Sequence, residues 1–178
     1  MSDIQKDLAN RFLGNSKAQE HFGNLLTEYR DSGLAPPNLQ QEIATGDEQK
    51  LWAFIWEAML YRHFANLGFQ FRTGRMPASR QNGPDIGLIH EGRTIWIEAV
   101  VPKPEGLSAE WLDPSKPGEF RARATPHEEM RLRWTSVLRD KNRQLKERLN
   151  KNVVNREEDY VVAINSCMLS DFPSEDYA

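Results

Sequence analysis

The chain has 178 residues, of which 39% are hydrophobic and 28% are charged, and its formal net charge is -3. This length suits one domain with a full hydrophobic core, and this composition excludes a disordered or fibrous protein. No stretch approaches the roughly 18 apolar residues of a membrane-spanning helix, and the N-terminus lacks a secretion-signal pattern. The single cysteine, Cys167, excludes an internal disulfide framework and a cysteine-based zinc site. We therefore expect a cytoplasmic protein with no membrane partner.

Charge is unevenly distributed along the chain. Residues 121–156 contain eleven Lys or Arg and four Asp or Glu, a net charge of +7, which leaves -10 for the remainder. A basic segment on an acidic body is compatible with a polyanion such as nucleic acid, although a solvated helix face has the same composition. The candidate phosphate contacts are arginines of this segment: Arg121, Arg123, Arg131, Arg139 and Arg143, with Arg148 in the same set.

Residues 1–44 are predicted to form an N-terminal helical extension. Two short helices are expected, at 3–13 and 16–31, with Ser16 as a candidate N-cap and Gly33 at the stop. Their apolar side chains predict packing against the rest of the protein, and the segment contains no motif with chemistry of its own.

The clearest helix is predicted at residues 47–67. Thr45 and Glu48 have the spacing of a capping box, and Gly68 stands where a C-terminal glycine belongs. The helix is apolar around most of its circumference, which is typical of a buried helix.

The rest of residues 45–178 is predicted to form an α/β core with the order α-β-β-β-α-β and a mixed central sheet. Glu91-Gly92 is the predicted turn of a hairpin. A proline-rich loop at 102–126 leads into a long helix at 127–150. Four segments have the apolar and β-branched composition of strands: residues 68–75, 86–90, 94–101 and 159–165.

Two carboxylates are predicted to meet at one end of this sheet. Asp85 follows Gly83-Pro84 at the mouth of a strand, and Glu98 stands inside the apolar strand TIWIEAVV. A carboxylate in such a strand is costly unless a cation compensates it. Because the hairpin joins the two strands, Asp85 and Glu98 are expected side by side, in an oxygen-rich site suited to Mg²⁺ or Mn²⁺.

A lysine stands out on the long helix. On a helical wheel, Lys141 lies within an apolar stripe, with Gln144 beside it. A lysine in this position either extends to solvent or meets a buried carboxylate or phosphate. The stripe itself consists of Met130, Trp134, Val137, Leu138 and Leu145.

The segment GPDIGLIHEGRTIWIEAVVPK, together with the element order of residues 45–165, resembles the core of the PD-(D/E)xK nuclease superfamily. The resemblance implies a restriction-endonuclease-like fold and a metal-dependent nuclease that hydrolyses phosphodiester bonds. It implies that Asp85, Glu98 and the carbonyl of Ala99 bind Mg²⁺ or Mn²⁺, and that Glu57 joins them from the first core helix. An endonuclease acting on DNA rather than RNA is favoured, and a homodimer is compatible with the resemblance.

The chain departs from the superfamily pattern at one position, because the triplet Glu98-Ala99-Val100 lacks the motif lysine. Some members relocate this lysine to the following helix, which makes Lys141 the candidate and Gln144 a further residue of the site. Lys103 is the competitor, and the absence of any substitute is the third possibility.

Two alternatives stay open at this point. Glu57 could instead form a salt bridge to Lys50 or Arg62 at the edge of its helix. The whole protein could also be a catalytically inactive binding or assembly module of the same fold, in which Glu98 and Lys141 form a buried ion pair.

Overall fold

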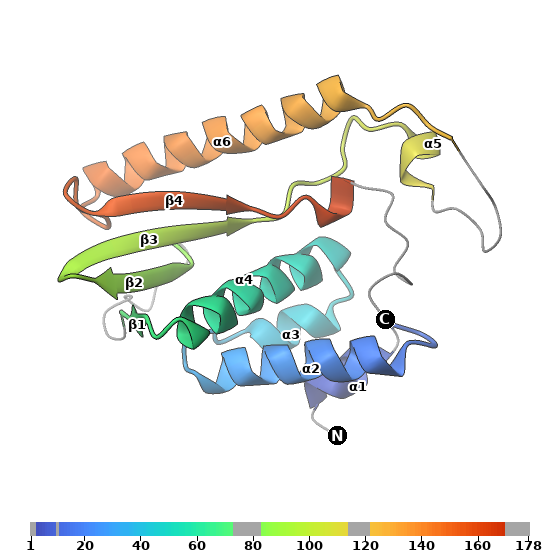
Figure 1. Ribbon diagram of the computed structural model, residues 1–178, viewed down its shortest axis with the longest axis horizontal. Coiled ribbons are helices and arrows are strands. Elements are labelled where there is room, and N and C mark those ends of the chain that lie inside the picture. Colours follow the sequence, from blue (N-terminus) through green and yellow to red (C-terminus); the bar gives the residue numbers. More distant parts are fainter. Residues whose placement is uncertain (1–2, 10, 73–82, 114–121, 170–178) are drawn as a thin grey trace.

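The computed structural model describes residues 3–9, 11–72, 83–113 and 122–169. These residues form a mixed α/β protein whose sheet has four strands (Figure 1). The elements in chain order are α1 (Asp3–Ala9), α2 (Ser16–Asp31), α3 (Leu39–Ala44), α4 (Glu48–Asn66), β1 (Gln70–Phe71), β2 (Ile86–His90), β3 (Arg93–Val100), α5 (Ala109–Leu112), α6 (His127–Asn150), β4 (Asp159–Ile164) and a 3₁₀ turn at Cys167–Leu169.

The sheet is mixed, with the strand order β1-β2-β3-β4. The first three strands are antiparallel, and β4 runs parallel to β3. The predicted hairpin turn is confirmed, because His90 pairs with Arg93 and both intervening residues have positive φ, 50° at Glu91 and 76° at Gly92. A two-residue turn with these angles matches the twist of the strands and fixes their register. That register pairs Ile86 with Ile97, which brings the start of β2 to the end of β3.

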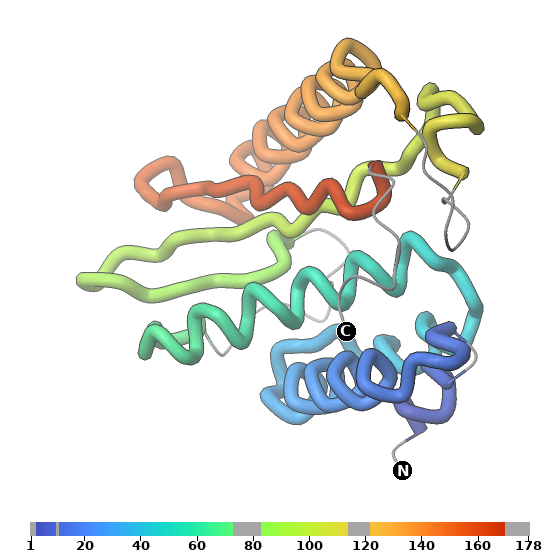
Figure 2. Tube along the Cα trace, turned by 45° about the vertical axis from the view of Figure 1, so that its right-hand side comes forward, coloured from blue at the N-terminus to red at the C-terminus, as the bar shows by residue number. Residues whose placement is uncertain are grey.

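Helices cover both faces of the sheet (Figures 1 and 2). The long helix α6 lies along one face, α4 lies across the other, and α1–α3 form a further layer beyond α4. Two apolar clusters account for this order of layers. In one, Leu51, Ile55 and Ala58 of α4 pack with the N-terminal helices; in the other, Leu60 packs with Ile97 of the sheet. The helix α4 is therefore apolar on both sides because it contacts a different layer on each.

The side chains of β3 alternate between the two faces of the sheet. Ile95, Ile97 and Ala99 belong to the cluster shared with α4, whereas Glu98 contacts α6. Trp96 lies across its partner Gly87, where an added Cβ would come within 2.7 Å of the indole ring. Glycine is therefore required at this point of β2, since any side chain would displace the tryptophan.

The starts of the helices differ from the predictions. The N-cap of α2 is Asn15, whose side chain accepts a hydrogen bond from Ala18 N at 2.9 Å, and not Ser16. The cap of α4 is Asp47, which accepts from Lys50 N at 3.1 Å, so the predicted capping box at Thr45 does not form. Asn and Asp cap as well as Ser and Thr do, and the spacing alone did not distinguish them.

Other element boundaries also differ. The helix α1 ends at Ala9, and the short helices α3 and α5 were not predicted. Of the strand predicted at 68–75, only Gln70–Phe71 is a strand, and residues 73–75 lie outside the described part of the chain. None of the helices among the described residues is long and apolar enough to cross a membrane.

Candidate active site

Asp85 is held at the end of the β2–β3 hairpin. Its backbone N–H donates to the carbonyl of Ile97 at 3.1 Å, and its side-chain Oδ2 accepts from Ala99 N at 2.7 Å. The preceding Pro84 is buried and fixes the entry of the chain. Among the described residues, the other carboxylate oxygen of Asp85 accepts no hydrogen bond. One oxygen thus orients the side chain, and the second is available for a ligand.

The carbonyl of Ala99 lies on the same side of β3 as Asp85. Neighbouring residues of a strand direct their backbone groups to opposite sides, and the Val100 carbonyl accepts from Asn165 N at 2.9 Å, beyond the end of β4. The Ala99 N–H, which points the other way, reaches Asp85. The Ala99 oxygen is therefore a second candidate ligand.

Glu98 is buried, with 3% of its surface exposed, and its carboxylate accepts from three side chains. Lys141 Nζ lies 2.6 Å from Oε1, Arg148 Nη1 lies 2.5 Å from Oε2, and Tyr160 Oη lies 3.0 Å from Oε2. Burial alone would raise the pKa of Glu98, but the hydrogen bonds and charges of Arg148 and Lys141 outweigh it and hold the pKa below its usual value. Glu98 is thus an ionised carboxylate inside the protein.

Lys141 reaches Glu98 from α6, and Gln144 of the same helix contacts Lys141. Lys141 Nζ donates to Gln144 Oε1 at 3.2 Å as well as to Glu98, and its side chain is 20% exposed. Lys103, the competing candidate, is exposed at the surface, and its carbonyl accepts from Arg133. Of the two lysines considered from the sequence, Lys141 is the one that contacts Glu98.

Two residues at Glu98 were not predicted as its partners. Arg148 was considered only as a phosphate contact, and Tyr160 was not considered at all. Arg148 Nη1 also donates to Tyr160 Oη at 2.7 Å, and Nη2 donates to the carbonyl of Gly83 at 2.8 Å. The contact of Arg148 with Glu98 could have been predicted from helical periodicity. Arg148 follows Lys141 by seven residues and so lies on the same helix face two turns later.

Glu57 approaches the cluster from α4, on the other side of the sheet. It accepts a hydrogen bond from Tyr29 Oη of α2 at 2.9 Å. Burial, followed by the charges of Glu57 and Glu98, raises the pKa of Asp85 well above its usual value. The charge of Glu57 is therefore close enough to act on Asp85.

The two basic side chains considered as salt-bridge partners of Glu57 have partners of their own. Lys50 forms an ion pair with Glu42 at 2.5 Å, and Arg62 forms one with Glu28 at 2.6 Å.

The oxygens that could hold a metal ion are those of Asp85 and Ala99. Among the described residues, Asp85 lies close enough to Glu98 and Glu57 for their charges to raise its pKa. Within the same residues, no group of three or more His, Cys, Asp or Glu side chains is arranged to hold a metal ion. The oxygen of Asp85 and the carbonyl of Ala99 suit Mg²⁺ or Mn²⁺, which prefer oxygen ligands. These two oxygens are therefore of the kind that a divalent ion binds.

Glu98 is the less available of the predicted ligands. Its four contacts, including Arg148 Nη2 at 3.4 Å from Oε1, equal the four acceptor positions of an ionised carboxylate. Glu98 could bind a metal only by giving up one of these contacts, of which the one at 3.4 Å is the weakest.

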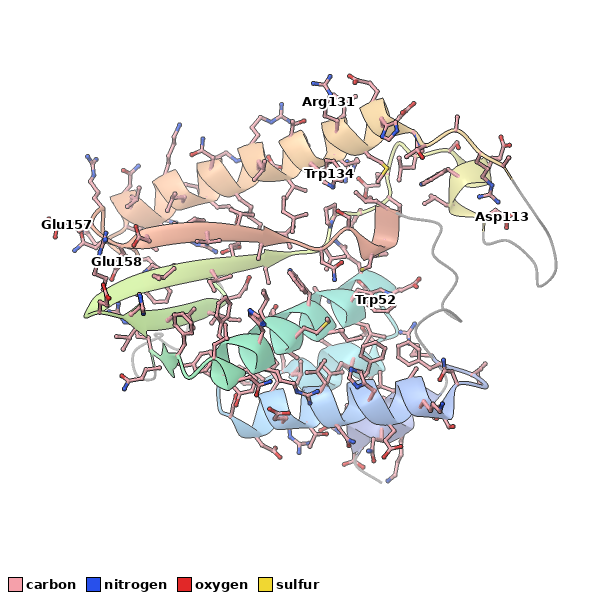
Figure 3. The ribbon with its side chains drawn as sticks, viewed as in Figure 1. Trp52, Asp113, Arg131, Trp134, Glu157 and Glu158 are labelled. Carbon is pink, nitrogen blue, oxygen red and sulfur yellow. The ribbon has the colours of Figure 1, made fainter. Side chains whose placement is uncertain are left out.

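The predicted phosphate-binding arginines of α6 lie away from the carboxylates. Arg131, Arg139 and Arg143 are exposed on the outer face of the helix, and Arg131 points away from the sheet in Figure 3. Arg131 pairs with Glu128 and Arg143 with Asp140. These three arginines do not converge on the candidate site.

The arginines before α6 also lie outside the site. Arg123 donates to the carbonyls of Trp111 and Asp113 at 2.9 and 2.8 Å, and so fastens the loop that contains α5. Arg121 lies outside the described residues.

Comparison with known proteins assigns no family, because no family model, curated protein or solved structure matches this chain.

Proposed function

We propose that the protein is a metal-dependent nuclease of the PD-(D/E)xK type that hydrolyses phosphodiester bonds, with DNA as the favoured substrate. The observation that supports this proposal most is the contact of Lys141 with Glu98, next to Asp85 at the end of one hairpin. The motif lysine is absent from the strand, and we assign its role to Lys141 of the following helix.

The arrangement of elements also supports the proposal. A helix, an antiparallel hairpin with a further strand, a second helix and a parallel fourth strand follow one another in the order expected for a restriction-endonuclease-like core. On the resemblance to the superfamily, Asp85 and Glu98 are the residues expected to bind the metal. The homodimer and the cytoplasmic location stay predictions from the sequence.

Each residue has a distinct role in the proposed reaction. Asp85, Ala99 through its carbonyl, and Glu98 would hold Mg²⁺ or Mn²⁺. A divalent ion in this position supplies Lewis-acid polarisation of the phosphate and makes water a stronger nucleophile. Lys141 uses two of its three ammonium hydrogens for Glu98 and Gln144 among the described residues. The third hydrogen can hold the attacking water or a phosphate oxygen and stabilise the charge that develops there.

A cleavage assay tests this proposal. Supercoiled plasmid, linear duplex, single-stranded DNA and RNA are incubated with the purified protein in Mg²⁺, in Mn²⁺ and in EDTA. Cleavage that needs the metal is expected, and Asp85→Asn and Lys141→Met should each reduce it by at least about 100-fold. Lys103→Met is the matched control, since this exposed lysine is away from Glu98 and its loss should leave the rate unchanged.

Two results would contradict the proposal. One is the absence of cleavage of any substrate under all metal conditions by folded wild-type protein. The other is unchanged cleavage by both Asp85→Asn and Lys141→Met.

A second candidate function is a catalytically inactive nuclease-fold module. The observation that favours it is the complete set of hydrogen bonds around Glu98, which neutralises this carboxylate without a metal. In that case Mn²⁺ would neither bind in calorimetry nor raise the unfolding temperature, and no substrate would be cleaved. Metal binding at Asp85 excludes this alternative.

A further inference from the structure

The two carboxylate oxygens of Glu98 have different surroundings. Oε1 accepts from Lys141 Nζ at 2.6 Å and has a second, longer contact with Arg148 Nη2 at 3.4 Å. Oε2 accepts from Arg148 Nη1 at 2.5 Å and from Tyr160 Oη at 3.0 Å. Two short hydrogen bonds thus hold Oε2, whereas Oε1 faces Lys141 and has one contact that is weak enough to be given up.

The hydroxyl of Tyr160 is held both in place and in the direction of its hydrogen. Tyr160 lies on β4 opposite Trp96, and the next residue of β4 on the same face, Val162, lies opposite Glu98. Arg148 Nη1 donates to Tyr160 Oη at 2.7 Å. Because a guanidinium group has no acceptor, the hydroxyl cannot donate to Arg148 in return. Its hydrogen is therefore available to Oε2 of Glu98.

The carboxylate of a glutamate needs such donors to keep one orientation. The torsion that turns the carboxylate is broad, so the side chain of Glu98 does not by itself decide which oxygen faces Lys141. Hydrogen bonds to Oε2 make that choice, and Tyr160 supplies one of them from a strand of the sheet.

We propose that Tyr160 is a positioning residue, which holds Oε2 of Glu98 and so keeps Oε1 directed at Lys141 and available to the metal ion. This inference rests on the proposed function, because it assumes that Asp85 and Glu98 bind a metal. Tyr160 contacts a ligand of the metal and not the reacting atoms, so it acts through Glu98.

Calorimetric titration of Mn²⁺ into Tyr160→Phe tests the inference, because phenylalanine keeps the ring and removes only the hydroxyl. The folded variant should bind Mn²⁺ about tenfold more weakly than the wild type, since outer partners of metal ligands typically contribute this much to metal affinity. At saturating Mn²⁺, kcat for DNA cleavage should fall and KM for DNA should stay unchanged, because the hydroxyl contacts Glu98 and Arg148 alone among the described side chains. Tyr61→Phe is the matched control. It removes the hydroxyl of a half-buried tyrosine whose ring lies 5.1 Å from that of Phe71, and it should bind Mn²⁺ as the wild type does.

The outcomes separate the two proposals. Mn²⁺ binding by Tyr160→Phe as tight as that of the wild type, or tighter, would overturn the inference about Tyr160, and so would a raised KM with an unchanged kcat. Failure of Tyr160→Phe to fold in EDTA, measured by circular dichroism, would overturn it as well, because the fold and not the site would then need the hydroxyl. These results leave the nuclease proposal intact. No binding of Mn²⁺ to the folded wild type would instead overturn the proposed function.

Discussion

Replacing Glu98 by leucine is expected to destabilise the protein far more than a change of similar size elsewhere on the sheet. The side chains of Arg148 and Lys141 are 11% and 20% exposed, and Glu98 is the ion-pair partner of both. Leucine preserves the volume but leaves two cations without their carboxylate inside the protein. Removing one partner of a buried ion pair typically costs about 3–5 kcal/mol, so a loss of this size in the free energy of unfolding is expected.

A triple variant tests whether the unpaired charge causes that loss. Replacing Glu98 by leucine together with Lys141→Met and Arg148→Met removes both cations along with the carboxylate. Such replacement of a whole buried ionic group by apolar side chains is often neutral, so the triple variant should return to within about 1 kcal/mol of the wild type.

Urea unfolding followed by circular dichroism, at pH 7 in EDTA, gives both free energies. A loss below about 1 kcal/mol in the single variant would refute the reasoning, because this is the scale of an exposed ion pair. A triple variant as unstable as the single one would refute it too, since packing and not charge would then explain the loss.

Two further predictions concern single carboxylates. Burial and the charge of Glu57 raise the pKa of Asp85. Ionisation of Asp85 therefore destabilises the folded state increasingly as the pH rises above 3.8, the usual pKa of the group. Because asparagine cannot ionise, Asp85→Asn should raise the unfolding temperature at pH 7 in EDTA. A lower unfolding temperature for this variant would contradict that account. Burial tends to raise the pKa of Glu158, but hydrogen bonds from Asn155 N, Trp96 and Arg72 outweigh it, so the pKa lies below its usual value of 4.5. The ionised Glu158 therefore stabilises the fold above pH 4.5, and this effect is lost as the pH falls below that value. The difference in unfolding free energy between wild type and Glu158→Gln should be largest at pH 7 and shrink in acid, and a difference independent of pH would disprove it.

The parts of the fold set by local pattern could be predicted from the sequence. The strand Ile86–His90 and the helix His127–Asn150 have the predicted bounds. The hairpin was predicted because a two-residue turn and strict alternation determine the register together. The same register brings Asp85 close to Glu98, so their proximity could be predicted from the sequence. Helical periodicity alone placed Lys141 on the face of α6 that contacts Glu98.

The parts that depend on tertiary contacts could not be predicted. Tyr160 donates a hydrogen bond to Glu98 because β4 pairs in parallel with β3. This pairing brings together two residues that are 62 positions apart in the sequence. The apolar stripe of α6 also proved to be only partly covered, since Leu138 is 47% exposed and no residue of this helix is buried. A helical wheel identifies a face but not how far the neighbouring layer extends over it.

The two-sided packing of α4 has a practical consequence for any shortened form of the protein. A chain that starts at residue 45 would leave Leu51, Ile55 and Ala58 in water, although all three belong to the helix beneath the sheet. It would also deprive Glu57 of the hydroxyl of Tyr29. The three N-terminal helices therefore support the carboxylate cluster from below, and removing them would alter a site that Tyr29 contacts through Glu57.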